Sequence, residues 1–173
     1  MDVHRLLREY NFKPRKGLGQ NFLVSEGALR RIVAAADLEP GDVVLEVGPG
    51  LGTLTRLLAH QAERVIAVEL DPQLVGILSR TLADFPNVEI VQGDILEMEP
   101  GGPGGLSELS PGYKVAANLP YYITSAVLRH LLTARVKPQL IVVTVQREVA
   151  QRMIASPGHM SLLSVSVQFY GRA

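Results

Sequence analysis

The sequence contains no cysteine and no tryptophan, and aromatic residues make up only 5% of its 173 residues. Without cysteine, the chain has no disulfide, no thiolate metal site and no cysteine nucleophile. It also has no long apolar run and no recognisable signal peptide, so the sequence predicts a cytoplasmic protein that does not engage a membrane. No metal is expected to take part in its function. The net charge is zero, so the overall charge does not point to a nucleic-acid partner.

Positive charge is nevertheless concentrated at the start of the chain. Residues 1–24 contain five basic and two acidic side chains, and Arg15 and Lys16 stand next to each other in a glycine-containing loop. A local basic arm can bind RNA phosphates even on a neutral protein. On charge alone, an ordinary solvated terminus explains the same pattern. The rest of the composition, 47% hydrophobic, predicts one globular domain with a substantial core.

The most informative stretch is Val43–Gly52, in which a β-branched run ends in three glycines at alternate positions. The run has the length and composition of a strand buried on both faces, as in a parallel sheet. Glycines allow a tight turn and let a ligand approach the backbone closely. Leucines at helical spacing follow, so the unit is a strand, a glycine turn and a helix, as at the start of nucleotide-binding α/β sheets. A turn that binds nothing is the alternative for this motif taken alone.

The spacing of the glycines separates two classes of cofactor-binding fold. A dinucleotide fingerprint has the form G-x-G-x-x-G, whereas this chain has G-x-G-x-G preceded by Glu46. That form resembles the first motif of S-adenosylmethionine-dependent methyltransferases. Both classes place a carboxylate at the end of the second strand to bind the two ribose hydroxyls, and Glu69 stands at that position. The pattern favours a methyltransferase over a dehydrogenase.

Strand-like and helix-like segments alternate along the chain, which predicts an α/β fold with a mainly parallel sheet and helices on both faces. Ser25 and Asp71 are suited to cap two of the helices, and either Thr124 or Ser125 is suited to cap a later one. The strands expected after the glycine turn are Arg64–Glu69, Val88–Gln92, Tyr113–Ala117 and Gln139–Val145.

Two segments are harder to interpret. Residues 100–112 contain five glycines and three prolines, and we expect them to form a mobile surface loop. Ser161–Tyr170 shows the apolar alternation of a strand, but Leu162, Val165 and Phe169 also fit one face of a helix.

The segment Asn118–Tyr121 lies at the end of the fourth expected strand, beside the first-strand glycines of a parallel sheet. Methylation of a base amine is difficult because the amine lone pair is delocalised into the ring. The side-chain oxygen of Asn118 and the backbone carbonyl of Leu119 could accept both amine hydrogens and localise that lone pair. Pro120 would stiffen the turn, and Tyr121 would stack on a target base that has left its own stack. A simple turn between strand and helix is the alternative for these four residues.

Taken together, the motifs resemble those of the ribosomal RNA adenine dimethyltransferases. They follow the family's order over nearly the whole chain. The resemblance implies a Rossmann-like, S-adenosylmethionine-dependent methyltransferase fold. It also implies dimethylation of the exocyclic amines of two adjacent adenosines near the 3′ end of small-subunit ribosomal RNA, in the immature 30S particle. The segments that carry the resemblance are Arg15–Leu23, Glu46–Gly52, Glu69–Asp71, Gly93–Asp94, Asn118–Ser125 and Val145–Ala150.

The resemblance also assigns roles to individual residues. Glu69 would bind the ribose and Asp94 the adenine amine of S-adenosylmethionine, with Asn118 between the cofactor and the target base. Asn21 and Leu23 would contact the methionine end of the cofactor. The full set expected around the cofactor is Asn21, Leu23, Gly48, Gly50, Glu69, Asp94 and Asn118, and the expected RNA contacts are Arg15, Lys16 and Tyr122.

Several alternatives stay open at this point. The erythromycin-resistance methyltransferases of large-subunit RNA share most of the motifs, although the pair Leu119 and Tyr122 favours the small-subunit enzyme. A non-catalytic RNA-binding or ribosome-assembly module could use the same fold, but the intact Asn118–Tyr121 segment argues against it. A nicotinamide-dependent oxidoreductase would require the missing G-x-x-G. By resemblance, we expect residues 1–173 to be the N-terminal catalytic portion of the family's architecture, without its last strands and C-terminal helical domain, and Ser161–Tyr170 to be a helix.

Overall fold

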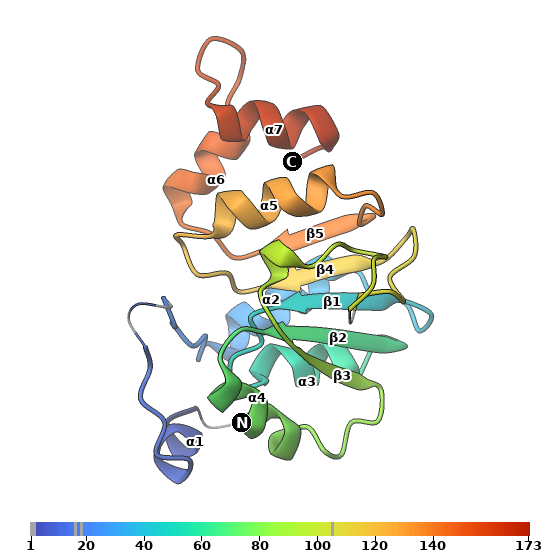
Figure 1. Cartoon of the computed structure of the whole chain (residues 1–173). Coiled ribbons are helices and arrows are strands. Elements are labelled where there is room, and N and C mark those ends of the chain that lie inside the picture. Colours follow the sequence, from blue (N-terminus) through green and yellow to red (C-terminus); the bar gives the residue numbers. More distant parts are fainter. Residues whose placement is uncertain (1–2, 16, 18, 105) are drawn as a thin grey trace.

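The structure is a computed structural model that describes residues 3–15, 17, 19–104 and 106–173. Its centre is a five-stranded sheet in the order β3-β2-β1-β4-β5, and every neighbouring pair of strands is parallel (Figure 1). The strand order reverses between β1 and β4, and open α/β sheets bind ligands at such a switch point. The strands are β1 (Val43–Val47), β2 (Arg64–Glu69), β3 (Val88–Gln92), β4 (Lys114–Ala117) and β5 (Leu140–Val143).

Helices cover both faces of this sheet, as the sequence predicts. Leu45 of β1 belongs to a core cluster that includes Leu131 on α5, whereas the adjacent Val44 belongs to a second cluster that includes residues of α2 and α3. This double burial explains why the consecutive residues Val43, Val44 and Leu45 of β1 are all apolar rather than alternating with polar ones. None of the helices in the described residues has the length and hydropathy to cross a membrane. The helices are α1 (Val3–Glu9), α2 (Glu26–Ala36), α3 (Thr53–Ala59), α4 (Pro72–Thr81), the 3-10 helix η2 (Ile95–Glu97), α5 (Thr124–Thr133), α6 (Arg147–Met153) and α7 (Leu162–Tyr170).

Two of the three predicted helix caps are confirmed. The side chains of Ser25 and Asp71 accept hydrogen bonds from backbone N–H groups in the first turns of α2 and α4. The third prediction is wrong, because the N-cap of α5 is Ile123, which has no capping side chain. The Thr124 hydroxyl instead donates to the carbonyl of Pro120 at 3.2 Å. This bond tightens the turn that leads from β4 into α5, which is where the predicted target-binding segment lies.

Residues 162–170 form the helix α7, as the family resemblance suggests and against the strand-like alternation. Ser161 starts the helix through a capping box, in which it exchanges hydrogen bonds with Ser164. The buried apolar residues of α7 are Leu163 and Val167, one helical turn apart. The face proposed from the sequence is therefore wrong, since Leu162, Val165 and Phe169 are exposed. Leu163 and Val167 pack with Leu128 of α5 in a separate core cluster, which partly buried residues of β5 adjoin.

The glycine-rich segment 100–112 is anchored more firmly than a surface loop would be. Leu106 and Leu109 are almost completely buried and belong to the same core cluster as the residues of β1 and β4. The carbonyl of Leu106 also accepts a hydrogen bond from the N–H of Gly101 at 2.8 Å. The apolar residues between the glycines and prolines are the signal that the sequence interpretation overlooked.

Candidate active site

A cavity opens at the carboxyl ends of β1, β2 and β4, beside the point where the strand order reverses. Ligands of open α/β folds bind at this edge of the sheet. The structure therefore brings together segments that are far apart in the sequence, including residues 19–23 in the arm before α2 and the turn after β4. The predicted site residues that line the cavity are Asn21, Leu23, Gly48, Gly50, Glu69, Asp94, Asn118, Leu119, Pro120, Tyr121 and Tyr122.

The glycine turn after β1 forms the floor of this cavity and requires its glycines. Gly50 and Gly52 have φ angles of 60° and 79°, in the left-handed region that side chains rarely adopt. A Cβ atom on Gly50 would also lie 3.0 Å from the ring of Phe22, which shows how closely the arm passes over the turn. The turn is thus compact, and residues 19–23 of the arm line the cavity across from it.

Glu69 ends β2 and directs its carboxylate toward the glycine turn. Oε2 accepts a hydrogen bond from the N–H of Gly50 at 3.2 Å, and Oε1 accepts one from the N–H of Asp71 at 2.9 Å. Burial raises the pKa of the Glu69 carboxyl, and these backbone donors partly oppose that rise. Each carboxylate oxygen has two lone pairs. The carboxylate therefore has lone pairs beyond those that accept from Gly50 and Asp71, and these can face a hydroxyl in the cavity.

Glu46 is a site residue that the sequence interpretation did not include. Its side chain lines the cavity from β1 and is only 1% exposed. Burial raises the pKa of the Glu46 carboxyl to about 8; the nearby hydroxyl of Thr55 opposes this rise, and the charge of Glu69 adds a smaller contribution to it. Within the described residues, its Oε2 and the hydroxyl of Thr55 are the buried side-chain oxygens without a hydrogen-bond partner. A buried carboxylate oxygen without a partner is suited to a donor that arrives with a ligand. The sequence signal for this site residue was the position of an acid, Glu46, two residues before the first glycine of the turn.

Asn118 follows β4, and the contacts of its amide define which way the group points. Its Nδ2 donates to the backbone carbonyl of Asn21 at 3.1 Å, and its Oδ1 accepts from the hydroxyl of Thr144 at 2.5 Å. Because a carbonyl can only accept, the atom that faces Asn21 must be the nitrogen. The amide therefore connects the arm to the end of β5, and Oδ1 keeps a second lone pair for another donor.

Thr144 is a second residue that the sequence interpretation missed. It follows β5, and its backbone N–H donates to the carbonyl of Ala117 at 3.0 Å, which extends the parallel ladder by one residue. This pairing places the Thr144 hydroxyl beside Asn118. The sequence could have indicated Thr144, because the carboxyl ends of adjacent parallel strands meet at the same edge of the sheet and Thr144 stands near the end of the strand predicted next to β4.

The turn after Asn118 presents two aromatic rings at the mouth of the cavity. The carbonyl of Pro120 accepts from the N–H of Ile123 at 3.2 Å, which closes the turn. Tyr121 and Tyr122 line the cavity and are 53% and 61% exposed, so their rings are accessible to a large ligand. Tyr122 also lies against the arm, because a Cβ atom on Gly19 would come within 2.8 Å of its ring.

Asp94 also lines the cavity, from the end of β3. It caps η2, and its Oδ1 accepts a hydrogen bond from the N–H of Leu96 at 2.9 Å. That contact fixes the carboxylate at the edge of the sheet. Within the described residues, no group of three or more histidines, aspartates or glutamates is arranged to hold a metal ion.

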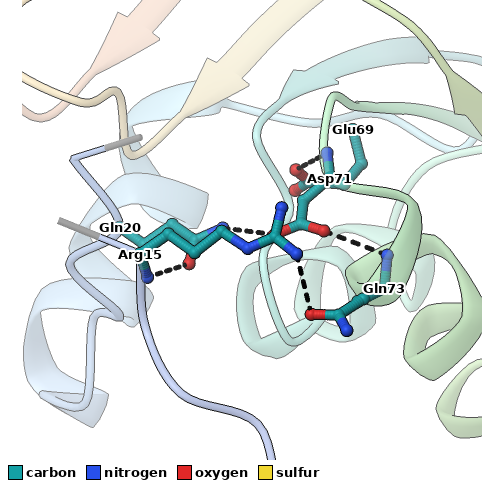
Figure 2. A network of polar contacts seen from close by, with 5 residues as sticks. All are labelled: Arg15, Gln20, Glu69, Asp71 and Gln73. Atoms are coloured by element: carbon teal, nitrogen blue, oxygen red, sulfur yellow. Dashed lines mark hydrogen bonds and ion pairs between the residues drawn. The ribbon is translucent and has the colours of Figure 1, made fainter. Parts of the chain in front are cut away.

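The two basic residues assigned to RNA differ in what the structure describes. Lys16 lies outside the described residues. Arg15 does not line the cavity; its guanidinium group is directed toward Asp71 and Gln73 at the start of α4 (Figure 2). An RNA contact by either residue stays a prediction.

Comparison with known proteins places this arrangement in a family. The family model for ribosomal RNA adenine dimethylase matches residues 11–172. Ribosomal RNA small subunit methyltransferase A of Dehalococcoides mccartyi is 53% identical over 166 residues, which cover 96% of this chain and 56% of that protein. The protein of the same name from Moorella thermoacetica is 49% identical over 95% of this chain and 60% of its own length. The chain thus spans somewhat more than half the length of these curated relatives.

Solved structures show the same fold. The 23S rRNA methyltransferase ErmE is 35% identical, with a TM-score of 0.71 over 84% of this chain and 56% of that chain. A dimethyladenosine transferase from Plasmodium falciparum is 30% identical, with a TM-score of 0.72 over 86% of this chain and 52% of that chain. With a methyltransferase sheet, the expected motifs around one cavity, and a family match over nearly all of its residues, the chain belongs to the ribosomal RNA adenine dimethylase family.

Proposed function

We propose that this chain binds S-adenosylmethionine in the cavity and uses it to methylate adenine amines of ribosomal RNA. The cofactor supplies a methyl group activated on a sulfonium, together with an ammonium group and a ribose that carries two hydroxyls. The residues present fit those groups. The carboxylate of Glu69 has lone pairs, beyond those that accept from Gly50 and Asp71, for the ribose hydroxyls. The unpartnered Oε2 of Glu46 lies in the same cavity and is suited to the ammonium group.

The observation that carries the proposal is the position of Asn118 beside this carboxylate-lined cavity. One hydrogen of the target amine would donate to the second lone pair of Oδ1, and the other to the backbone carbonyl of Leu119. These bonds draw the amine lone pair out of conjugation with the ring and toward the methyl group. Each transfer would break the bond between the methyl group and the sulfonium, form an N–CH3 bond in place of one N–H bond, and leave S-adenosylhomocysteine and one proton. The exposed ring of Tyr121 offers a face on which the flipped base stacks, a contact that contributes about 1–3 kcal/mol.

The substrate that we propose is a pair of adjacent adenosines near the 3′ end of small-subunit ribosomal RNA, within the immature 30S particle in the cytoplasm. Relatives named ribosomal RNA small subunit methyltransferase A support this choice, as does the pair Leu119 and Tyr122. The likeness to a 23S rRNA methyltransferase supports the alternative, a large-subunit adenine. A non-catalytic module on this fold would not require the oriented amide of Asn118.

Transfer of tritiated methyl groups separates these functions. The chain would be incubated with labelled S-adenosylmethionine and either immature small subunits or large-subunit RNA, and the modified nucleosides would then be identified. Labelled dimethyladenosine in small-subunit RNA is the expected result. Label in large-subunit RNA alone would favour the alternative, and cofactor binding without any transfer would favour the non-catalytic module.

Replacing Glu69 with alanine should weaken S-adenosylmethionine binding at least about tenfold. Each hydrogen bond to a charged group contributes about 1.5–3 kcal/mol, and two ribose hydroxyls would lose their acceptor. The variant should also unfold at a lower temperature, because the N–H groups of Gly50 and Asp71 lose their partner. Calorimetric titration measures the affinity, and Glu63→Ala, an exposed residue at the opposite end of β2, is the control. Unchanged affinity in Glu69→Ala would remove Glu69 from the site.

Replacing Thr144 with valine should slow methyl transfer about three- to tenfold, because one neutral hydrogen bond contributes about 0.5–1.5 kcal/mol. Valine keeps the shape of threonine and removes only the hydroxyl that orients Asn118. Thr144→Ser keeps the hydroxyl and should restore the rate. Single-turnover kinetics at saturating RNA measures the effect. Equal rates for the serine and valine variants would show that the hydroxyl has no positioning role.

A further inference from the structure

We propose that Arg15 is a positioning residue for the cofactor site, because its ion pair with Asp71 holds the segment Gly19–Leu23, here called the strap, across the cavity. This inference rests on the proposed function and adds a role that charge patterning alone does not reveal. The same arginine was expected from the sequence to contact RNA phosphates. In the structure the guanidinium group of this half-exposed side chain is directed toward Asp71 and Gln73 (Figure 2).

The contacts converge on the carboxylate of Asp71 from two sides. Its Oδ1 accepts a hydrogen bond from the N–H of Gln73, and through this bond Asp71 caps α4. Its Oδ2 accepts from Nε2 of Gln20 at 3.0 Å and lies 3.6 Å from Nε of Arg15. Gln20 and Arg15 are also joined to each other, since the N–H of Arg15 donates to Oε1 of Gln20 at 2.8 Å. The guanidinium group is further oriented by Oε1 of Gln73 at 3.1 Å.

Burial makes this pair more than a surface contact. The side chain of Asp71 is 0% exposed, whereas that of Arg15 is 49% exposed. A buried carboxylate needs a compensating charge in addition to neutral hydrogen-bond donors. Within the described residues, Arg15 is the ion-pair partner of Asp71. Loss of the guanidinium group would therefore favour a movement of the strap that lets water reach Asp71.

The strap has a second attachment on the other side of the cavity. The carbonyl of Asn21 accepts from Nδ2 of Asn118, so the strap runs from the end of β2 to the end of β4. Directly after the second attachment, Phe22 lies close to Gly50 in the glycine turn. All five residues of the strap line the cavity. Release of the attachment at Asp71 would therefore open one wall of the cofactor site.

The attachment also adjoins the residue proposed to bind the ribose. The N–H of Asp71 donates to Oε1 of Glu69, so the acid that holds the strap also helps to fix the ribose acceptor. Asp71 therefore couples closure of the strap to the alignment of Glu69, because its carboxylate binds Gln20 and Arg15 while its N–H binds Glu69. A bound cofactor would leave slowly only while both contacts persist.

Ligand dissociation from the whole chain tests the proposal. The dissociation rate of S-adenosylhomocysteine would be measured for the wild type, Arg15→Gln, Arg15→Lys, Asp71→Asn and the double variant Arg15→Gln/Asp71→Asn, in 0.1 M and 1 M NaCl. Asparagine retains the helix cap, so Asp71→Asn removes the charge with little effect on α4. Arg8→Gln, an exposed cation of α1, is the matched control. Exchange of the backbone amides of the strap with deuterium would be followed in parallel.

We expect Arg15→Gln to release the ligand about five- to tenfold faster, with an unchanged melting temperature and faster exchange in the strap. Lysine at this position should restore part of the effect, and the double variant should be no worse than the single ones, because the two residues act as one pair. Wild-type dissociation should quicken in 1 M NaCl, where the screening length falls to about 3 Å, and Arg15→Gln should lose this dependence.

Three results would overturn the proposal. The first is deuterium exchange in the strap of Arg15→Gln at the wild-type rate. The second is ligand dissociation from Arg15→Gln at the same rate as from Arg8→Gln. The third is an Arg15→Gln variant that binds RNA more weakly but releases the ligand at the normal rate. The first measurement needs no ligand. A wild-type chain that fails to bind S-adenosylhomocysteine would therefore refute the proposed function, while the exchange data would still decide the role of Arg15.

Discussion

Replacing Asn118 with alanine should lower the rate of methyl transfer by about two to three orders of magnitude at saturating RNA and cofactor. Removal of one oriented group that stabilises a transition state costs about that much in other enzymes. Here the lost group is Oδ1, whose orientation Thr144 and Asn21 define from opposite sides. The oxygen acts on the target amine, so its main effect should fall on kcat rather than on the KM for RNA.

The same substitution also removes the Nδ2 contact to the carbonyl of Asn21, and this contact belongs to the strap. We therefore expect cofactor affinity to fall by no more than a few-fold in Asn118→Ala. Single-turnover transfer and calorimetric binding separate the two effects. Tyr121→Ala is the comparison, because loss of the stacking ring should raise the KM for RNA more than it lowers kcat. A rate within tenfold of the wild type for Asn118→Ala would show that the amine is held by other groups.

The sheet was predictable from the sequence because its strands are buried on both faces. Consecutive apolar residues, as in the run that starts at Val43 and within Arg64–Glu69, stand out at this length, and the predicted range Arg64–Glu69 agrees with β2. Glycines after β1 and an acid after β2 mark the carboxyl edge, where a parallel sheet collects the ends of its strands. The position of the cavity followed from this arrangement without any knowledge of side-chain packing.

Helix faces and polar contacts between strands were less predictable. The apolar residues of α7 occur on more than one side, so periodicity could not decide whether Leu162 or Leu163 faces inward; the packing against α5 decides this. Thr144 became a site residue only through its register against β4, which brings its hydroxyl to Asn118. Arg15 looked like part of a solvated basic arm because its partner, Asp71, is distant in the sequence.

Glu46 provides the second large effect, which concerns both stability and binding. The Glu46 carboxyl has a pKa of about 8 in the folded chain and an ordinary pKa of 4.5, so it stays protonated in the folded state over a pH range in which the unfolded chain has released the proton. The folded state thus binds more protons in this range, so the free energy of unfolding falls as the pH rises from about 4.5 to about 8. The decline from this one group is about 1.4 kcal/mol for each pH unit.

Glu46→Gln should remove that part of the pH dependence, because the amide has nearly the same shape and does not ionise. The variant should be about as stable as the wild type near pH 5 and clearly more stable near pH 8. Urea denaturation at intervals of one pH unit measures the difference, and Glu63→Gln, an exposed residue, is the control. Parallel curves for the wild type and Glu46→Gln would mean that Glu46 is ionised in the folded chain at neutral pH.

The gain in stability should be accompanied by a loss of cofactor affinity. If the ammonium group of S-adenosylmethionine pairs with Glu46, binding at pH 7 must displace the proton that the buried carboxyl holds, and close to one proton should be released for each cofactor bound. Wild-type affinity should then strengthen as the pH rises toward 8, whereas Glu46→Gln should bind at least about tenfold more weakly at pH 8 and show no such trend. Calorimetry in two buffers with different ionisation enthalpies counts the protons. Proton release that is the same in the wild type and in Glu46→Gln would place the ammonium group elsewhere in the cavity and leave Glu46 as a buried acid without a ligand contact.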